Sequence, residues 1–311
     1  MTESRSIGFI GLGAMGMGIA SRLLAKGHRV TAHDVRPEMR DPWVGLGGRW
    51  APSPAEAADG AQALVLMVVN SEQVESVLFG AEGALSTLAP GTVVIVHSTV
   101  SPAYSRQLGG RLAGAGFPML DAPVSGGVAA AANGTLSVMA SGGGPAFAAS
   151  EGILAAVAAR IHRIGDEPGL GSAVKTVNQL LAGAHIALAA EAMAFGAKAG
   201  IDTQVLYDVI SGSAGNSWMF TNRVPHMLDG DYRPLSAVNI FVKDLGIVLE
   251  MASEMRFPAP LAALAHQLFI TAAASGHAHE DDAAVVKVYE ALSGASVARG
   301  ANKQAWRGAP A

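Results

Sequence analysis

The chain has 311 residues, of which half are apolar and 15% are charged, and it contains no cysteine. This length exceeds one typical domain, and the composition favours a packed globular core over disorder. The formal net charge of −4 gives no indication of a basic surface for nucleic acid or for an anionic membrane. Without cysteine, disulfides, thiol nucleophiles and thiolate zinc sites are excluded. The polar N-terminal residues lead directly into a strand, so we expect no secretory signal. The absence of cysteine fits a reducing environment, so we expect a cytoplasmic protein.

The first half of the chain alternates between short β-rich runs and helix-like stretches. Strands are expected at 6–10, 29–32, 63–69, 92–97, 117–121 and 135–140. Helices are expected at 14–26, 54–58, 71–78, 102–114 and 146–158. Strand, helix and strand in this order indicate right-handed crossovers and a parallel sheet, so this half is expected to be an α/β domain.

Beyond Gly171 the strand signals almost vanish. Helices rich in alanine, leucine and methionine are expected at 171–199, 203–211, 217–228, 236–255, 258–274 and 281–293. The most apolar window of this half contains His185 and Glu191, which would be costly in lipid, so a buried helix is preferred over a membrane span. We therefore expect a domain at 1–168 with a parallel sheet and an all-helical domain at 169–311.

Three glycines, Gly11, Gly13 and Gly16, follow the first strand and open the first helix. The first permits a tight turn, the second lets the backbone approach a pyrophosphate, and the third allows helix and strand to pack closely. In this context the spacing predicts a Rossmann-type dinucleotide site, with Ala14 and Met15 at the helix end that faces the anion. A tight turn without a ligand is the alternative.

An acidic residue, Asp34, lies at the end of the second strand. A carboxylate there accepts hydrogen bonds from the ribose hydroxyls and repels a 2′-phosphate, so NAD is expected in preference to NADP. Arg36 keeps NADP open, because its guanidinium could bind that phosphate. Asn70 and Thr99 follow the next two expected strands, at the sheet edge where the cofactor is expected. Helix caps or turn formers are the alternative for both residues.

The segment 121–127 contains Ser125, Gly126 and Gly127. Consecutive amides in such a loop can point the same way and form a small concavity for an anion, and the serine hydroxyl adds a donor. A carboxylate is the expected guest. A glycine-rich turn without a ligand is the simpler alternative.

Lys175 lies near the start of the long helix expected at 171–199. A lysine held in a dry cleft can take or give a proton while a hydride moves, because burial favours the neutral amine. A surface lysine is the alternative, but the positive end of a helix dipole disfavours that position. Asn178 and Gln179 follow about one turn later, so we expect them to orient Lys175 or to bind substrate hydroxyls.

These motifs resemble those of the β-hydroxyacid dehydrogenases, over nearly the whole chain. The matching segments are 8–16 for the cofactor, 121–127 and 134–136 for the substrate, 171–175 for catalysis, and 243–245 on the cofactor side. Many members carry Lys-x-x-x-Asn, whereas here Gln179 stands in the place of that asparagine, after Asn178. His97 also departs from the family pattern, which puts a functional role for it in doubt.

The resemblance implies a Rossmann domain followed by an all-helical domain, with catalysis in the cleft between them. It further implies that Lys175 is the general base or acid, that residues 125–127 hold a substrate carboxylate, and that Lys243 lies near the nicotinamide. The order of Asn178 and Gln179 is shared by members that act on tartronate semialdehyde and by members that act on L-threonate. The segments 216–220 and 222–225 resemble the members that act on L-threonate most closely, so oxidation of a small polyhydroxy acid is expected. Tartronate semialdehyde and 3-hydroxyisobutyrate are the alternative substrates.

Other functions remain open from the sequence. An imine reductase on a similar scaffold would generally replace the lysine, and a dinucleotide-binding module without catalysis would have lost it. The run from His277 to Asp282 could suggest a metal, but a loop that leads into an acidic helix start explains it, so no metal is expected. Trp218, Met219 and Phe220 could line a substrate pocket or pack in the core. The wide apolar helix faces predict a homodimer or homotetramer.

Overall fold

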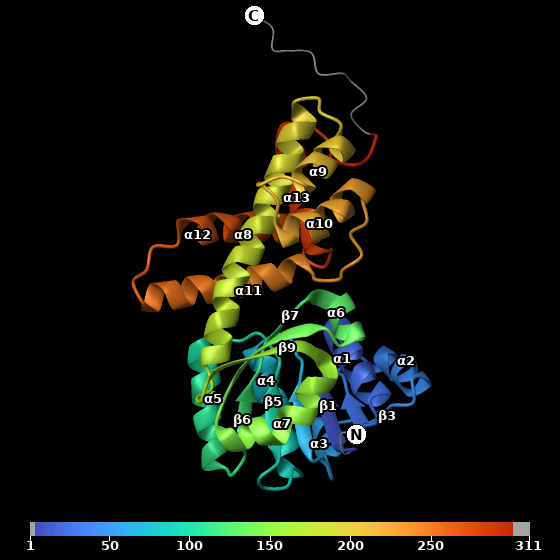
Figure 1. Cartoon of the computed structure of the whole chain (residues 1–311), viewed down its shortest axis with the longest axis vertical. Coiled ribbons are helices and arrows are strands. Elements are labelled where there is room, and N and C mark those ends of the chain that lie inside the picture. Colours follow the sequence, from blue (N-terminus) through green and yellow to red (C-terminus); the bar gives the residue numbers. More distant parts are fainter. Residues whose placement is uncertain (1–3, 301–311) are drawn as a thin grey trace, which may run out of the picture. The chain divides into compact units, whose positions relative to one another are not determined.

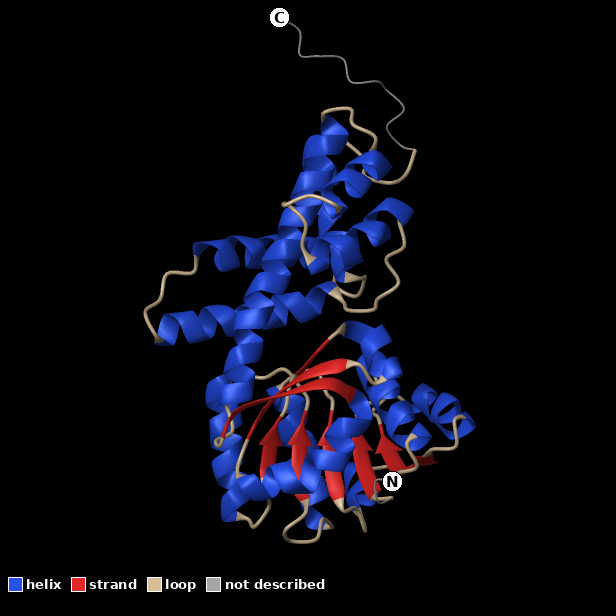
Figure 2. Ribbon diagram, in the orientation of Figure 1, coloured by secondary structure: helices blue, strands red, loops and turns tan. Residues whose placement is uncertain are grey.

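The computed structural model describes residues 4–300 of the chain. By contacts the chain divides into two compact units, one that ends at Thr176 and one that begins at Val177. The named strands of the described residues all lie in the first unit, and the second unit is helical (Figure 2). This confirms the expected order of an α/β Rossmann-type domain and an all-helical domain.

The first unit is built on one nine-stranded sheet with the order β3-β2-β1-β4-β5-β6-β8-β7, in which β9 pairs with β8. The strands are β1 (Ser6–Ile10), β2 (Arg29–His33), β3 (Arg49–Trp50), β4 (Ala63–Leu66), β5 (Val93–Val96), β6 (Met119–Asp121), β7 (Val124–Ser125), β8 (Leu136–Ser141) and β9 (Ala158–Gly165). Strands β1 to β6 pair in parallel, and Ile7 of β1 lies opposite Val30 on one side and Ala63 on the other. The chain order reverses between β1 and β4, which is where doubly wound sheets bind dinucleotides.

Helices cover both faces of this sheet (Figure 1). The helices of this unit are α1 (Ala14–Ala25), α2 (Arg40–Gly45), α3 (Pro54–Ala58), α4 (Ser71–Phe79), α5 (Pro102–Gly114), α6 (Gly127–Asn133) and α7 (Gly144–Val157). Side chains of β5 alternate between two cores: Val93 and Ile95 join the core under α1 and α7, and Val94 and Val96 join the core under α4 and α5. A strand buried on both faces reads as a continuous apolar run, which is why the sequence indicated it clearly.

The sheet differs from the expectation at one edge. β8 runs antiparallel to β6 and β7, so this end of the sheet is mixed instead of parallel. β9 was not expected, because its residues Arg160, Ile161, His162 and Arg163 are all exposed and show no alternation of burial. The segment 125–127, expected as a loop, instead ends β7 and opens α6.

The second unit is a bundle of helices. They are the part of α8 (Leu170–Lys198) from Val177 onward, α9 (Thr203–Ser211), α10 (Trp218–Asp229), α11 (Val238–Glu254), α12 (Pro260–Ala272) and α13 (Val286–Ser293). α11 and α12 lie side by side (Figure 1), and Phe241 stacks on Phe269 with ring centroids 5.1 Å apart. Of the described helices, α8 alone is long and apolar enough to cross a membrane, yet Ile186 and Met193 are fully buried in the bundle core. Core helices of soluble proteins pass the same test of length and composition.

Candidate active site

The turn between β1 and α1 requires glycine at two of its three glycine positions. Gly11 has φ +98°, and a Cβ there would lie 2.4 Å from the carbonyl oxygen of Met67. A Cβ at Gly16 would lie 1.9 Å from the carbonyl oxygen of Gly11. Only glycine fits these sites, because the turn is tight and the helix packs closely on the strand.

The middle glycine has a different environment. A Cβ at Gly13 would meet only the Arg36 guanidinium, at 3.9 Å, so no contact inside the protein demands glycine there. Gly13 caps α1 with extended backbone, and Ala14 and Met15 form the first turn of that helix. The space beside Gly13, at the positive end of a helix, fits the pyrophosphate of a dinucleotide.

The carboxylate of Asp34 lies next to this turn. It accepts hydrogen bonds from the Leu12 amide at 2.7 Å, and from the Arg36 amide and Nε at 2.9 and 3.0 Å. Burial raises the pKa of Asp34, but the hydrogen bonds from Arg36 and Leu12 outweigh burial and hold the pKa below its usual range. The group is therefore an ionised acceptor at neutral pH, as binding of ribose hydroxyls requires.

Two further residues lie at the carboxyl edge of the sheet. Asn70 caps α4, because its Oδ1 accepts a hydrogen bond from the Gln73 amide at 2.9 Å. This is the cap geometry that the sequence left as one alternative. Thr99 follows β5 and is half-buried.

His97, between β5 and Thr99, is fully buried. Its Nδ1 lies 2.6 Å from the carbonyl oxygen of Ala122, which can only accept, so Nδ1 carries the hydrogen. Burial lowers the pKa of His97, against the opposing effect of this hydrogen bond. The residue that departs from the family pattern thus holds the backbone of the segment that leads to Ser125.

The glycines after Ser125 have backbone conformations that other residues rarely adopt. Gly126 has φ +133° and Gly127 has φ +72°. A Cβ at Gly126 would also lie 2.7 Å from the Cβ of Ala130, whereas nothing lies within 4 Å of a Cβ at Gly127. Ser125, Gly126 and Gly127 are all half-buried, so this turn is accessible to a small ligand.

Lys175 lies in the part of α8 that belongs to the first unit, and only 7% of its surface is exposed. Its Nζ donates a hydrogen bond of 2.8 Å to the carbonyl oxygen of Val124. Lys175 is therefore not a surface lysine. The structure brings its amine to the residue next to Ser125.

A buried carboxylate that the sequence did not single out contacts the start of α8, the helix that carries Lys175. Asp121, at the end of β6, is fully buried and accepts hydrogen bonds from the amides of Gly169 and Ser172 at 2.8 and 2.9 Å. Burial raises the pKa of the Asp121 carboxyl, against the hydrogen bonds from Ser172 and Gly169, which lower it. The contacts join residues 48 and 51 positions apart in the sequence, so no local pattern could reveal them.

The second unit gathers another set of polar side chains. Gln179 is buried, and its Nε2 donates to Oδ2 of Asp244 at 2.5 Å, while Asn178 donates to Oε1 of Gln179 at 2.9 Å. Lys243 Nζ lies 2.7 Å from the other carboxylate oxygen of Asp244. The motif around Lys243 was the only sequence signal for Asp244. Asp244 lies 65 positions after Gln179, so only the folded structure reveals that the two residues meet.

The aromatic segment 218–220 and the acidic segment 280–282 both lie in the second unit, where their side chains pack in the core, form ion pairs or face solvent. Phe220 is buried in the helical core and Trp218 is exposed. Asp282 pairs with Arg223, and Glu280 pairs with Lys287. Within residues 4–300 no group of three or more histidine and carboxylate side chains is arranged to hold a metal ion.

Comparison with known proteins identifies both halves of the chain. Residues 6–165 match the family model described as the NAD binding domain of 6-phosphogluconate dehydrogenase. Residues 169–289 match the model described as NAD-binding of NADP-dependent 3-hydroxyisobutyrate dehydrogenase. Together the two models span most of the chain, and both describe nicotinamide dinucleotide enzymes.

Individual relatives cover the chain almost completely. The chain is 54% identical to an L-threonate dehydrogenase of Cupriavidus necator, over 93% of this chain and 97% of the relative. It is 47% identical to the L-threonate dehydrogenase of Escherichia coli K12, over 92% of this chain and 95% of the relative. A crystal structure described as 3-hydroxyisobutyrate dehydrogenase from Salmonella typhimurium matches with a TM-score of 0.88 and 48% identity, over 92% of this chain and 100% of that one. The chain therefore belongs to the β-hydroxyacid dehydrogenase family of NAD(P)-dependent oxidoreductases that act on CH–OH groups.

Proposed function

We propose that this enzyme oxidises the alcohol of a small polyhydroxy carboxylic acid with NAD, and that L-threonate is the substrate. The observation that carries the proposal is the buried Lys175 amine, 2.8 Å from the carbonyl oxygen of Val124 and next to Ser125. Several relatives between 44% and 54% identical are named L-threonate dehydrogenase, which supports this choice of acid.

The substrate carboxylate is assigned to Ser125, Gly126 and Gly127. The hydroxyl of Ser125 and the amides of the two glycines are the donors, and the open space beside Gly127 leaves room for the acid. Fixing the carboxylate sets which carbon of the acid is presented for oxidation. Asn178 and Gln179 are assigned to the further hydroxyls of a polyhydroxy acid or to the orientation of the lysine.

The proton is assigned to Lys175. In the direction of oxidation, its neutral Nζ accepts the proton of the substrate hydroxyl. In the reverse direction, the ammonium donates that proton to the carbonyl oxygen. When bound, the nicotinamide ring supplies the hydride acceptor or donor. Lys175 lies in the first turns of α8, which keeps its amine close to the residues assigned to the carboxylate.

The cofactor is assigned to the turn after β1 and to the edge of the sheet. The residues are Gly11, Gly13, Ala14, Met15, Gly16, Asp34, Asn70, Thr99 and Lys243. NAD is preferred over NADP because the ionised Asp34 would repel a 2′-phosphate, and Arg36 is already hydrogen-bonded to that carboxylate. The division of the sequence near residue 168 into cofactor and substrate domains is part of the same proposal.

A panel of hydroxy acids tests the proposal directly. Reduction of NAD and of NADP would be followed with L-threonate, 3-hydroxyisobutyrate, glycerate and their stereoisomers. We expect the highest kcat/KM with L-threonate and NAD. The 3-hydroxyisobutyrate dehydrogenase named among the solved structures makes that acid the main competitor. Binding of NAD without oxidation of any acid would instead indicate a dinucleotide-binding module.

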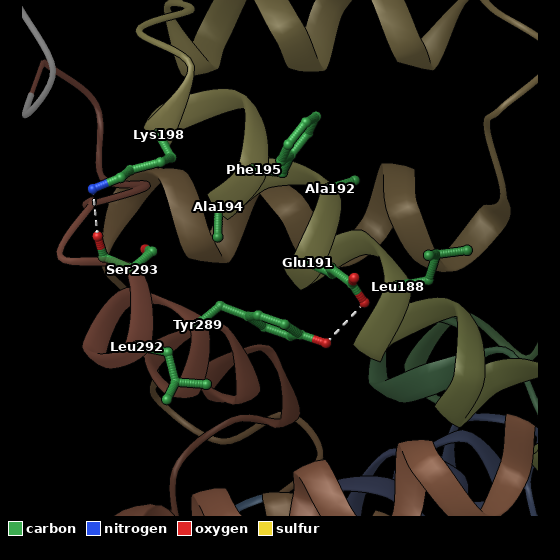
Figure 3. A pocket seen from close by; sticks show the side chains of 9 residues that line it. All are labelled: Leu188, Glu191, Ala192, Ala194, Phe195, Lys198, Tyr289, Leu292 and Ser293. Carbon is green, nitrogen blue, oxygen red and sulfur yellow. Dashed lines mark hydrogen bonds between the residues drawn. The ribbon is translucent and has the colours of Figure 1, made fainter.

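We also propose that the enzyme is a cytoplasmic homodimer or homotetramer. Leu181, Leu188 and Phe195 are exposed along one face of α8, at intervals of seven residues. Beside them, α8 and α13 line an apolar hollow of about 580 Å³, in which Tyr289 donates to Glu191 (Figure 3). Contiguous exposed apolar patches mark protein interfaces. Sedimentation of a Phe195→Glu variant should show a lower mass than the wild type, and a monomeric wild type would contradict the proposal.

A further inference from the structure

The start of α8 is held by side chains from two strands. The Oδ2 atom of Asp121 on β6 accepts hydrogen bonds from the amides of Gly169 and Ser172, and Oδ1 accepts one from Ser172 Oγ at 2.7 Å. Ser141 on β8 accepts a hydrogen bond of 2.9 Å from the Gly171 amide. The first amides of a helix have no partner within the helix, and here distant strands supply the acceptors that a neighbouring cap usually supplies.

The helix start is also pressed against these strands. A Cβ at Gly171 would lie 2.3 Å from the carbonyl oxygen of Met139 and 2.8 Å from that of Asp121. The first turn of α8 therefore has little freedom to slide or rotate on the sheet. Its position is set by the same strand that leads into the proposed substrate segment.

Two contacts join the segment 121–124 to α8, and both contacts link residues that are 51 positions apart. Asp121 at the end of β6 contacts Ser172 of α8, and three residues further along the chain in both segments Val124 at the start of β7 contacts Lys175. Residues three apart on a helix lie on the same face, one turn from each other. The first contact thus fixes the height and rotation of α8 at which the second contact can form.

We propose that Asp121 is a positioning residue for the reaction: its buried carboxylate holds the first turn of α8 so that the Lys175 amine stays beside Val124 and Ser125. The proposal rests on the assignment of the proton to Lys175. Asp121 itself touches neither substrate nor cofactor in this account. It acts through the helix.

The decisive variant is Asp121→Asn, which keeps the size of the side chain and replaces one acceptor oxygen with a donor that faces other donors. We expect kcat for the hydroxy acid to fall about 10- to 100-fold, because small displacements of a catalytic group have effects of this size. The dissociation constant for NAD should change less than about twofold, since Asp121 is not among the residues assigned to the cofactor.

A double-mutant cycle separates positioning from general damage. If Asp121 acts through Lys175, Asp121→Asn should leave the residual rate of Lys175→Ala almost unchanged. Equal fold-losses in the two backgrounds, or a wild-type kcat for Asp121→Asn, would overturn the proposal. Ser53→Ala is the matched control: Ser53 is a buried cap of α3 in the same unit, 3.2 Å from the Glu56 amide, and its loss should lower stability without lowering kcat.

One further measurement and one further variant keep the test decisive. Modification of Lys175 by an amine-selective reagent, read by peptide mass spectrometry, should be faster in Asp121→Asn and unchanged in Ser53→Ala. This readout needs no activity, so it decides the positioning claim even if the wild type oxidises no acid and the proposed function fails. If Asp121→Asn does not fold, Ser172→Ala removes one hydrogen bond to the carboxylate. It should lower kcat about two- to tenfold and speed the modification, and no change in either would overturn the proposal.

Discussion

The two lysines of the family motifs, Lys175 and Lys243, have different partners. Lys175 Nζ donates to a backbone carbonyl, that of Val124, which carries no net charge. Lys243 Nζ lies against the carboxylate of Asp244 at 2.7 Å. A backbone carbonyl can accept a hydrogen bond from an amine in its neutral or its charged form, whereas the contact of Lys243 with Asp244 is an ion pair. The difference supports the proposal that Lys175 transfers the proton, while Lys243 is proposed to contribute positive charge near the nicotinamide.

The largest expected effect comes from removing the first of these amines. Lys175→Ala should lower kcat by about 10²- to 10⁴-fold, the range for loss of a general acid or base. Lys175→Arg should be similarly impaired, because a guanidinium keeps its proton at any pH that the protein tolerates. Steady-state kinetics with NAD and L-threonate measure both effects, and the affinity for NAD serves as the control. A Lys175→Arg variant with near wild-type kcat would contradict the proposal that Lys175 transfers the proton.

A smaller effect is expected at the second lysine. Lys243→Ala should raise the KM for the hydroxy acid about tenfold with a modest change in kcat, because a positive charge that attracts anions contributes mainly to binding. Lys243→Arg keeps the charge beside Asp244 and should restore most of the loss. If arginine is as harmful as alanine at this position, Lys243 does more than supply charge.

The smallest expected effect concerns the segment that leads to Val124, whose carbonyl oxygen accepts the hydrogen bond from Lys175. Neutral His97 donates to the carbonyl oxygen of Ala122, two residues before Val124. Burial lowers the pKa of His97 in the folded protein below the ordinary value of 6.5. A lowered pKa means that the folded state favours the neutral ring, so this stabilisation is complete above pH 6.5 and is lost as the pH falls through the folded pKa.

His97→Asn tests this dependence. The variant should lose about 1 kcal/mol of unfolding free energy at pH 8. Its difference from the wild type should shrink as the pH is lowered below 6.5, where protonation of His97 penalises only the wild type. Denaturant unfolding at a series of pH values measures this. A difference that stays constant from pH 8 to pH 5 would show that His97 does not titrate as the buried site requires.

Residues whose role depends on local geometry could be predicted from the sequence. Gly11 and Gly16 follow from the tight turn between a strand and a helix, and the structure shows that any larger residue would clash there. The apolar run of β5 likewise indicated a buried strand. Local spacing suffices when the constraint lies within one turn of chain.

Residues whose role depends on packing could not be predicted in this way. In the sequence, Asp121 is only the first residue of the segment 121–127. Its role could not be predicted because its partners lie 48 and 51 positions later. The edge strand β9 was missed because its side chains are exposed and show no periodicity. The helix after Gly126 was taken for a loop, since two glycines with positive φ precede or open it.

Chemical rescue tests the role of the Lys175 amine most directly. The Lys175→Ala variant would be assayed with NAD and L-threonate in the presence of small primary amines that can enter the vacated space. We expect amines to restore part of the lost rate, with a dependence on amine basicity, because the missing group is a proton acceptor. A Lys175→Ala variant with wild-type activity, or one that no amine of any size or basicity restores, would contradict the assignment.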